Sequence, residues 1–225
     1  MTLGSSESFS STSSASSISS APHAKSSPPE TVGESIAPLP VPFTSQAPFA
    51  NWNDPYQEAC EEAALLMVVH LLNGTALNPQ IADREILDLV AWETENGYPQ
   101  DVTAAQMAEI ARSRFGLRSR VRTDVSEESI KEELAEGNPV IIPAAGRDLG
   151  NPYFSGKGPW YHALVIIGFR RGWTGRRYFI VNDPGTKRGK SYEYNVETLL
   201  NAIHDWTGVK EEIRNGPKVM VVLEK

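Results

Sequence analysis

The 225-residue sequence contains a single cysteine, Cys60. One cysteine cannot form an intramolecular disulfide, so the fold does not depend on oxidation. It also excludes a metal site built from several cysteines, and the four histidines show no spacing typical of metal ligands. We therefore expect neither a bound metal nor a cofactor.

The sequence also lacks long apolar stretches and an excess of positive charge. No segment reaches the roughly 18 apolar residues of a membrane-spanning helix, and the N-terminus has neither the basic nor the apolar region of a signal peptide. The formal net charge is -7, and the short basic clusters lie beside acidic stretches, which disfavours nucleic-acid binding. Cellular location stays open: cytoplasmic as the chain stands, or secreted or envelope-associated, with membrane contact, if an anchor lies upstream.

Large apolar side chains are scarce near the N-terminus. Residues 1–38 are rich in serine, alanine and proline, and this composition predicts a disordered tail or linker, because too little apolar surface is available to offset the entropy of ordering. Residues 39–225 contain no comparable interruption. They predict one domain with a substantial core, which we expect to be monomeric.

Helical patterns precede strand patterns along this domain, which predicts an α+β fold. The segment from Cys60 to Asn73-Gly74 is apolar on nearly every side, so we expect a central, buried helix. Val41, Phe43 and Ser45 alternate in a way that suits the edge of a sheet. Further helices are predicted near 79–95, 104–115, 126–137 and 196–206, with Thr103 and Ser126 as the N-caps of the second and third. Strands are predicted near 117–123, 139–145, 162–171, 176–184 and 218–225.

Two segments about a hundred residues apart carry reactive side chains. Cys60 opens a helix, where unpaired N–H groups and the helix dipole favour a thiolate. Glu61 and Glu62 would oppose that effect, so we expect them to point away from the sulfur. His162 stands at the start of an apolar strand, from which it can act as general base to Cys60 and then as general acid.

Asp183 ends the strand that follows His162, and the intervening "GWTG" turn predicts a hairpin. An aspartate beside the imidazole would fix its tautomer and stabilise the imidazolium. Asn182 alternates to the opposite face and is the weaker candidate. Taken singly, the three groups also have structural explanations: a small buried cysteine, a histidine at a strand end and an Asp-Pro turn.

Other side chains are candidates for stabilising or binding a substrate. Gln46 could donate an amide N–H to a developing oxyanion, and Gln57 competes for that role. Trp52, Trp160 and Tyr161, with the glycine-rich segment "YFSGKGPW", could line a cleft for a peptide or protein substrate.

Three segments, "VPFTSQAPFANW...ACEEAALLMV", "WYHALVIIGF" and "FIVNDPGT", resemble the bacteriocin-processing, double-glycine type of peptidase in the papain-like cysteine peptidase superfamily, in a stand-alone form. The resemblance implies a papain-like fold, with N-terminal helices and a central nucleophile helix packed on a C-terminal antiparallel sheet. It implies Cys60 as nucleophile, His162 as base, Asp183 as orienting group and a glutamine, for which we choose Gln46, in the oxyanion hole. The chain departs from many members in having Glu61 directly after the cysteine.

The sequence thus predicts a cysteine peptidase that hydrolyses peptide bonds through a thioester acyl-enzyme. One alternative is a papain-like module that binds peptide without turnover. Another is a transglutaminase-like acyltransferase, because a fold and a Cys-His-Asp set do not decide between transfer to water and transfer to an amine.

Overall fold

The structure is a computed structural model that describes residues 35–225. The predicted tail at 1–38 lies outside the described residues except for its last four. There Ile36 exchanges two backbone hydrogen bonds with Phe169, of 2.8 and 3.0 Å. Backbone pairing therefore begins a few residues before the boundary that we predicted at residue 39.

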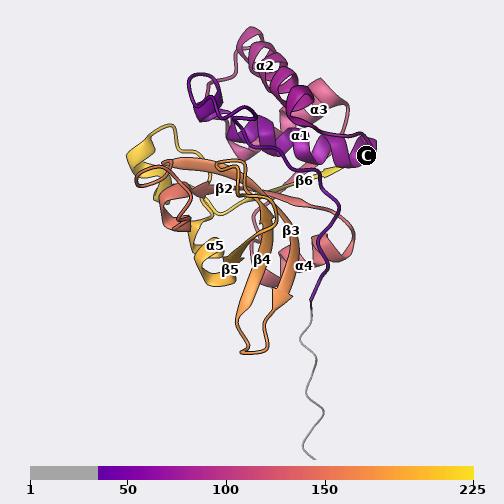
Figure 1. The fold of residues 1–225 in the computed structure, drawn as a ribbon, viewed down its shortest axis with the longest axis vertical. Coiled ribbons are helices and arrows are strands. Elements are labelled where there is room, and N and C mark those ends of the chain that lie inside the picture. Colours follow the sequence, from indigo (N-terminus) through magenta and orange to yellow (C-terminus); the bar gives the residue numbers. More distant parts are fainter. Residues whose placement is uncertain (1–34) are drawn as a thin grey trace, which may run out of the picture. The chain divides into compact units, whose positions relative to one another are not determined.

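Within residues 35–225, one antiparallel sheet has the strand order β1-β6-β2-β3-β4-β5 (Figure 1). The predicted hairpin is present as the adjacent strands β3 and β4, and β3 lies near the middle of the sheet. The strands are β1 (Arg118–Arg122), β2 (Val140–Ala145), β3 (Tyr161–Arg171), β4 (Arg177–Asn182), β5 (Tyr192–Asn195) and β6 (Met220–Glu224).

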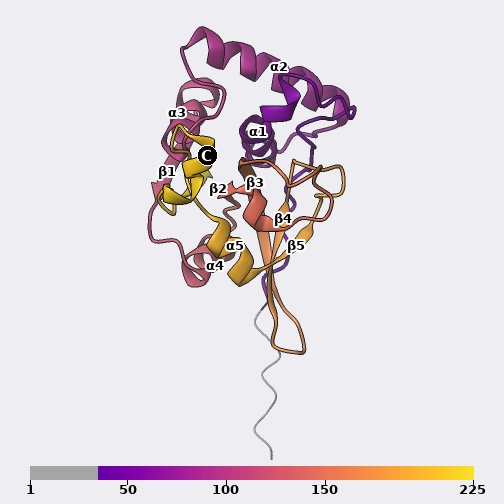
Figure 2. The ribbon, with the colours of Figure 1, turned by 90° about the vertical axis from the view of Figure 1, so that its left-hand side faces the viewer.

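Helices cover both faces of this sheet. The first three pack on one face, and the last two pack on the other (Figures 1 and 2). This arrangement confirms the α+β fold with N-terminal helices on an antiparallel sheet. The helices are α1 (Cys60–Asn73), α2 (Pro79–Glu95), α3 (Ala104–Phe115), α4 (Glu127–Ala135) and α5 (Val196–Ala202).

The central strand β3 is apolar on both faces because each face carries a core. Ala163 and Val165 belong to the core under α1, whereas Leu164 and Ile166 belong to the core under α4 and α5. Successive side chains of a strand point to opposite faces. The nearly continuous apolar run in this segment is therefore what a doubly covered strand requires.

Helix α1 is the central helix that the sequence predicts. Every residue from Cys60 to His70 is buried, and Gly74 ends the helix in the left-handed conformation at φ 66°. The predicted N-cap residues Thr103 of α3 and Ser126 of α4 both accept a hydrogen bond from a backbone N–H of the first turn. Local sequence signals thus fixed the ends of these helices correctly.

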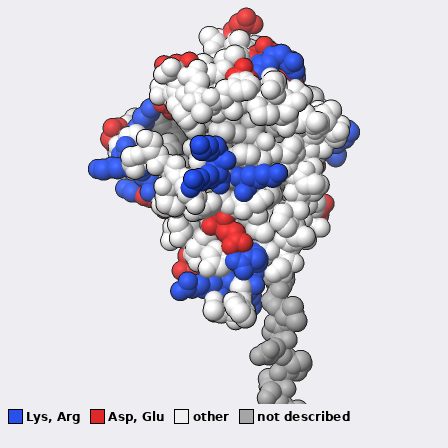
Figure 3. Space-filling model, viewed as in Figure 1, with Lys and Arg blue, Asp and Glu red and all other residues white. Residues whose placement is uncertain are grey.

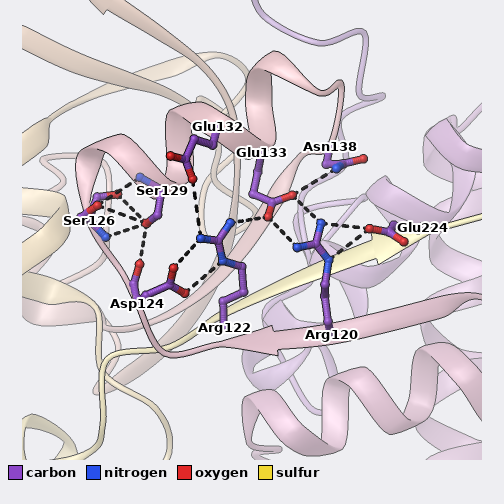
Figure 4. Close-up of polar contacts among 9 residues, drawn as sticks. All are labelled: Arg120, Arg122, Asp124, Ser126, Ser129, Glu132, Glu133, Asn138 and Glu224. Atoms are coloured by element: carbon purple, nitrogen blue, oxygen red, sulfur yellow. Dashed lines mark hydrogen bonds and ion pairs between the residues drawn. The ribbon is translucent and has the colours of Figure 1, made fainter.

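A buried carboxylate joins β1 to α4 (Figure 4). Glu133 is 1% exposed and lies between Arg120, which donates to it at 2.8 Å, and Arg122, which donates to it at 2.5 Å. Asn138 adds a bond of 3.1 Å. Because every neighbour of Glu133 in this group is a donor, the charge is compensated and the edge strand is tied to the helix.

The β3–β4 hairpin carries arginines on both arms, and in this part of the surface basic side chains lie beside acidic ones (Figure 3). Arg170 pairs with Glu193 of β5 at 2.7 Å, and Arg177 pairs with Glu127 of α4 at 2.5 Å. Trp173 at the tip is fully exposed. The hairpin therefore projects beyond both cores.

One prediction about strands is wrong, and one strand was not predicted. The alternating segment at 41–45 joins no ladder; its last residue, Ser45, is buried and donates its hydroxyl to the Pro184 carbonyl at 3.1 Å. Strand β5 was not predicted, since "YEYN" is short and carries a charge; it forms by pairing with β4. In the described part of the chain, no helix is long and apolar enough to cross a membrane.

Candidate active site

The start of α1 lies against the start of β3. The backbone N–H of Ala163 donates to Cys60 Sγ at 3.3 Å, which places the sulfur beside the residue that follows His162. Both side chains are almost fully buried, with Cys60 4% and His162 1% exposed. The apolar face of α1 packs on β3, and this packing brings together two residues that are about a hundred positions apart in the sequence.

Asp183 contacts His162 as the predicted hairpin requires. The register pairs Val165 with Asn182, so the end of β4 lies beside the start of β3. His162 Nε2 and Asp183 Oδ1 are 2.7 Å apart. This contact leaves Nδ1 as the ring nitrogen able to exchange a proton with a thiol. Asn182 points elsewhere, since its amide donates to the carbonyl of Val41.

Asp183 is held by four donors. Besides His162, the backbone N–H of Gly185 donates to Oδ1 at 2.9 Å, while Tyr194 and Asn151 donate to Oδ2 at 2.5 and 2.9 Å. Burial alone would raise the pKa of Asp183, but His162 and these hydrogen bonds hold that pKa below its usual value. The aspartate is therefore an anion prepared to orient the imidazole.

Sequence reasoning missed Tyr194 and Asn151. Both approach Asp183 from outside the hairpin, Tyr194 from β5 and Asn151 from the loop before β3. No motif marks either one. Only the pairing of β5 with β4 reveals that the Tyr194 hydroxyl can reach the carboxylate.

The expectation that Glu61 points away from the sulfur is wrong. Cys60 Sγ donates to Glu61 Oε2 at 2.9 Å, and among the described residues no hydrogen bond joins this sulfur to His162. Burial, together with the charge and hydrogen bond of Glu61, raises the pKa of the Cys60 thiol well above its usual value. Each of these effects favours the protonated thiol over the thiolate.

Gln46 lies in the same pocket as Cys60, buried and 4% exposed. Its Nε2 donates to the carbonyls of Tyr56 at 2.9 Å and Gln57 at 3.0 Å, and its Oε1 has no partner within residues 35–225. The amide is thus near the sulfur but engaged with main-chain carbonyls. The Gln57 side chain instead donates to Asp54 at an exposed position.

A pocket of about 570 Å³ opens over the cysteine and the histidine. Trp52 and Tyr161 line it, and so does part of the glycine-rich segment before β3. Trp160 does not, because its ring faces the Arg147 guanidinium 3.4 Å away. Other lining residues include Ala50, Glu58, Tyr153, Phe154, Pro159, Gly185, Thr186 and Lys187.

The His162 ring is packed from two further sides. Phe154 meets it edge-on, with ring centroids 5.4 Å apart. A Cβ at Gly185 would lie 2.8 Å from His162 Cε1 and 2.9 Å from the Phe154 ring. Glycine at this position is therefore needed for the loop after β4 to close on the imidazole.

A second hollow, of about 700 Å³, lies at the other end of α1 around His70. Both ring nitrogens of His70 are already bonded, to Glu85 and Thr75 at 2.7 Å each. Within residues 35–225, no group of three or more His, Cys, Asp or Glu side chains could hold a metal ion. The reactive groups thus converge at the pocket over Cys60.

A family model matches residues 38–212, and its description is Peptidase_C39 like family. The chain belongs to the Peptidase_C39 like family. Among solved structures it is similar to a protein from Bacillus anthracis named a C39-like peptidase, with a TM-score of 0.54 and 13% identity over 86% of this chain and 99% of that one. At this identity the likeness supports the fold alone. No curated protein matches the chain.

Membership of the Peptidase_C39 like family confirms the resemblance to a papain-like peptidase of the C39 type. It also indicates cysteine peptidase activity as the function class.

Proposed function

We propose that the chain is a cysteine peptidase that hydrolyses peptide bonds through a thioester acyl-enzyme. One observation carries the proposal: the 2.7 Å contact between His162 Nε2 and Asp183 Oδ1, made beside the Cys60 sulfur at the floor of an open pocket. A histidine at a strand end or an aspartate in a turn could do its structural work at the surface, so their burial favours a role in the pocket. A nucleophile, a base and an orienting carboxylate in one pocket are what acyl transfer to sulfur requires.

In the proposed reaction, His162 Nδ1 takes the proton from Cys60 and the thiolate attacks the carbonyl carbon of the scissile bond. The imidazolium then gives this proton to the leaving amine as the C–N bond breaks, which leaves a thioester on Cys60. Water, deprotonated by His162, hydrolyses the thioester and restores the thiol. Asp183 stabilises the imidazolium throughout and keeps Nδ1 directed at the sulfur.

Two donors are available for the oxyanion. The backbone N–H of Cys60 begins α1 and has no hydrogen-bond partner among the described residues. Gln46 Nε2 is the second, and it can serve once substrate displaces one of its bonds to the carbonyls of Tyr56 and Gln57. Such donors stabilise the charge that develops in the transition state.

The test uses the full chain and denatured casein, with peptide products identified by mass spectrometry. We expect cleavage by the native protein, and none by Cys60→Ala or His162→Ala. His204→Gln is the matched control, because His204 Nδ1 bonds to the Gly216 carbonyl and lies outside the pocket. Cleavage that persists in Cys60→Ala would contradict the proposal.

The alternative functions appear as other outcomes of the same experiment. Transfer of the acyl group to added hydroxylamine, with little hydrolysis in its absence, would indicate an acyltransferase. Casein peptides retained without cleavage would indicate a binding module. Acid-quenched intact protein should carry an acyl adduct that is absent from Cys60→Ala, and this adduct separates covalent catalysis from simple binding.

A further inference from the structure

Glu61 is wholly buried although it lies in the first turn of α1, where an acidic side chain usually faces solvent. Its two oxygens have different partners. Oε2 accepts from Cys60 Sγ at 2.9 Å, and Oε1 accepts from the backbone N–H of Val102 at 3.1 Å. The carboxyl group thus bridges the sulfur and the segment that leads into α3, and the second bond fixes its orientation.

Among the described residues, the charged groups that act on Glu61 are acidic. Glu62 of α1, Asp101 before α3 and Glu93 of α2 all interact with it electrostatically, and all are acids. Tyr161 of β3 faces it as well, with its hydroxyl donated to the Val102 carbonyl at 2.8 Å. None of the ion pairs formed within residues 35–225 includes Glu61. Burial and the charges of Glu62 and Asp101 raise the pKa of Glu61 well above its usual value.

The sulfur is thus hydrogen-bonded to Glu61 and to the backbone N–H of Ala163 in this structure. Glu61 holds the S–H bond on one side, while the base that the proposed reaction needs, His162, makes no hydrogen bond to the sulfur in the described part of the chain. We propose that Glu61 is a positioning residue that holds the Cys60 thiol in a protonated resting state and controls its release to His162. This inference rests on the proposed function, because control of the thiol matters only if Cys60 is the nucleophile. The contact between Glu61 and Cys60 does not depend on that function.

Release is a proton transfer without any other reactant. The S–H group leaves Glu61 Oε2, its proton passes to His162 Nδ1, and the products are a thiolate and an imidazolium paired with Asp183. A carboxyl group that accepts from the thiol opposes this step, because the hydrogen bond stabilises the protonated sulfur. A donor in the same place would favour the step, since it would stabilise the thiolate.

Glu61→Gln makes this change with little change in shape. The amide oxygen can keep the bond to the Val102 N–H, and the amide nitrogen takes the place of Oε2 and donates to the sulfur. We expect the rate of Cys60 alkylation by iodoacetamide at pH 6 to rise about tenfold, with the pH profile displaced toward acid. The control is Glu62→Gln, because Glu62 is in the same turn and also buried, and its charge acts on the sulfur, but it accepts no hydrogen bond from Cys60 Sγ. We expect a smaller displacement in this variant than in Glu61→Gln.

An unchanged alkylation profile in folded Glu61→Gln, or the same displacement in Glu62→Gln, would overturn the inference. If Glu61→Gln does not fold, the native protein supplies a second test. The chain has one cysteine, so its infrared spectrum has one S–H stretching band. We expect that band at neutral pH, at the position of a hydrogen-bonded thiol, and its absence would mean that the resting sulfur is a thiolate.

These measurements do not depend on peptide cleavage. A native protein that does not cleave casein, together with a displaced profile in Glu61→Gln, would refute the proposed function and leave the role of Glu61 intact. Cleavage of casein by the native protein, together with an unchanged alkylation profile in Glu61→Gln, would support the proposed function and refute the role of Glu61.

Discussion

The hydroxyl of Tyr194 donates to Asp183 Oδ2 at 2.5 Å, while His162 occupies Oδ1 of the same carboxylate. Asp183 is therefore held from two directions, by the strand that carries the imidazole and by the edge strand β5. This links the geometry of the pocket to an element that contributes no residue to its lining.

Tyr194→Phe should weaken that hold without opening a large cavity. Losing a hydrogen bond to a buried anion should lower the free energy of unfolding at pH 7 by about 1–2 kcal/mol. Because the folded-state pKa of Asp183 is below its usual value of 3.8, the stability that its partners provide is present above that value and is lost as pH falls through the folded-state pKa. The variant's deficit should therefore shrink in acid, which urea denaturation at several pH values would measure.

The control for this prediction is Tyr192→Phe. The Tyr192 ring packs against that of Tyr194, with centroids 4.7 Å apart, but its hydroxyl forms no hydrogen bond with another described residue. An equal loss of stability in both variants would mean that ring packing, rather than the bond to Asp183, accounts for the effect.

Gly185→Ala should impair catalysis. The added methyl group would come within 2.8 Å of His162 Cε1, so either the imidazole or the loop must move. A displacement of this size at a reacting group can cost about a hundredfold in rate, so we expect kcat/KM on casein peptides to fall by about that factor. Gly172→Ala meets nothing closer than 3.6 Å and should leave kcat/KM unchanged, whereas equal losses in both would exclude a steric effect at His162.

Trp52→Ala should weaken substrate binding. Trp52 lines the pocket and is 42% exposed, so its ring is available to cover a bound peptide. Loss of that apolar contact should raise KM about tenfold, with a smaller effect on kcat. Trp173→Ala removes the same side chain from the hairpin tip, where it is fully exposed, and should change neither constant. Steady-state kinetics on one peptide substrate would compare them.

Glu93 should make the fold less stable as pH rises. Burial raises the pKa of Glu93 from 4.5 to about 7. The folded state thus binds more protons between these values, so the stabilising effect is full below about 4.5 and is lost as pH rises through about 7. Between pH 5 and pH 8, the free energy of unfolding should fall by about 2 kcal/mol more in the native protein than in Glu93→Gln. Urea denaturation at the two pH values would measure this difference.

Glu95→Gln is the control for this pH dependence, because Glu95 is exposed on the same helix. The free energy of unfolding of Glu95→Gln should decline with rising pH as much as that of the native protein. If Glu93→Gln also keeps the full decline, another group must titrate.

The sequence predicted those parts of the fold that depend on local chemistry. Thr103 and Ser126 cap helices because a short polar side chain directly before a helix can accept a hydrogen bond from a backbone N–H of the first turn. The hairpin between β3 and β4 followed from its turn, and that hairpin brought Asp183 to His162. Strand β5 escaped prediction because its stability comes from pairing with β4, and the pattern of its own residues does not favour a strand.

Candidate site residues stood out in the sequence where their chemistry is scarce, as for Cys60, the only cysteine. Glu61 was placed wrongly because a first-turn glutamate normally faces water, and its burial results from α3 packing over the start of α1. Trp160 was expected in the cleft from its neighbours in sequence, yet its ring packs on the Arg147 guanidinium and does not line the pocket. Such outcomes depend on which elements meet, and a local pattern does not contain that information.

The described chain begins beside the hairpin end of β3, where the backbone N–H of Arg171 donates to the Ser35 hydroxyl. His162 stands near the other end of the same strand, about 30 Å away at the usual rise per residue. A resin or fusion partner joined directly at Ser35 would therefore be attached far from the mouth of the pocket. Immobilisation through this end should leave the pocket open even to a bulky, folded substrate.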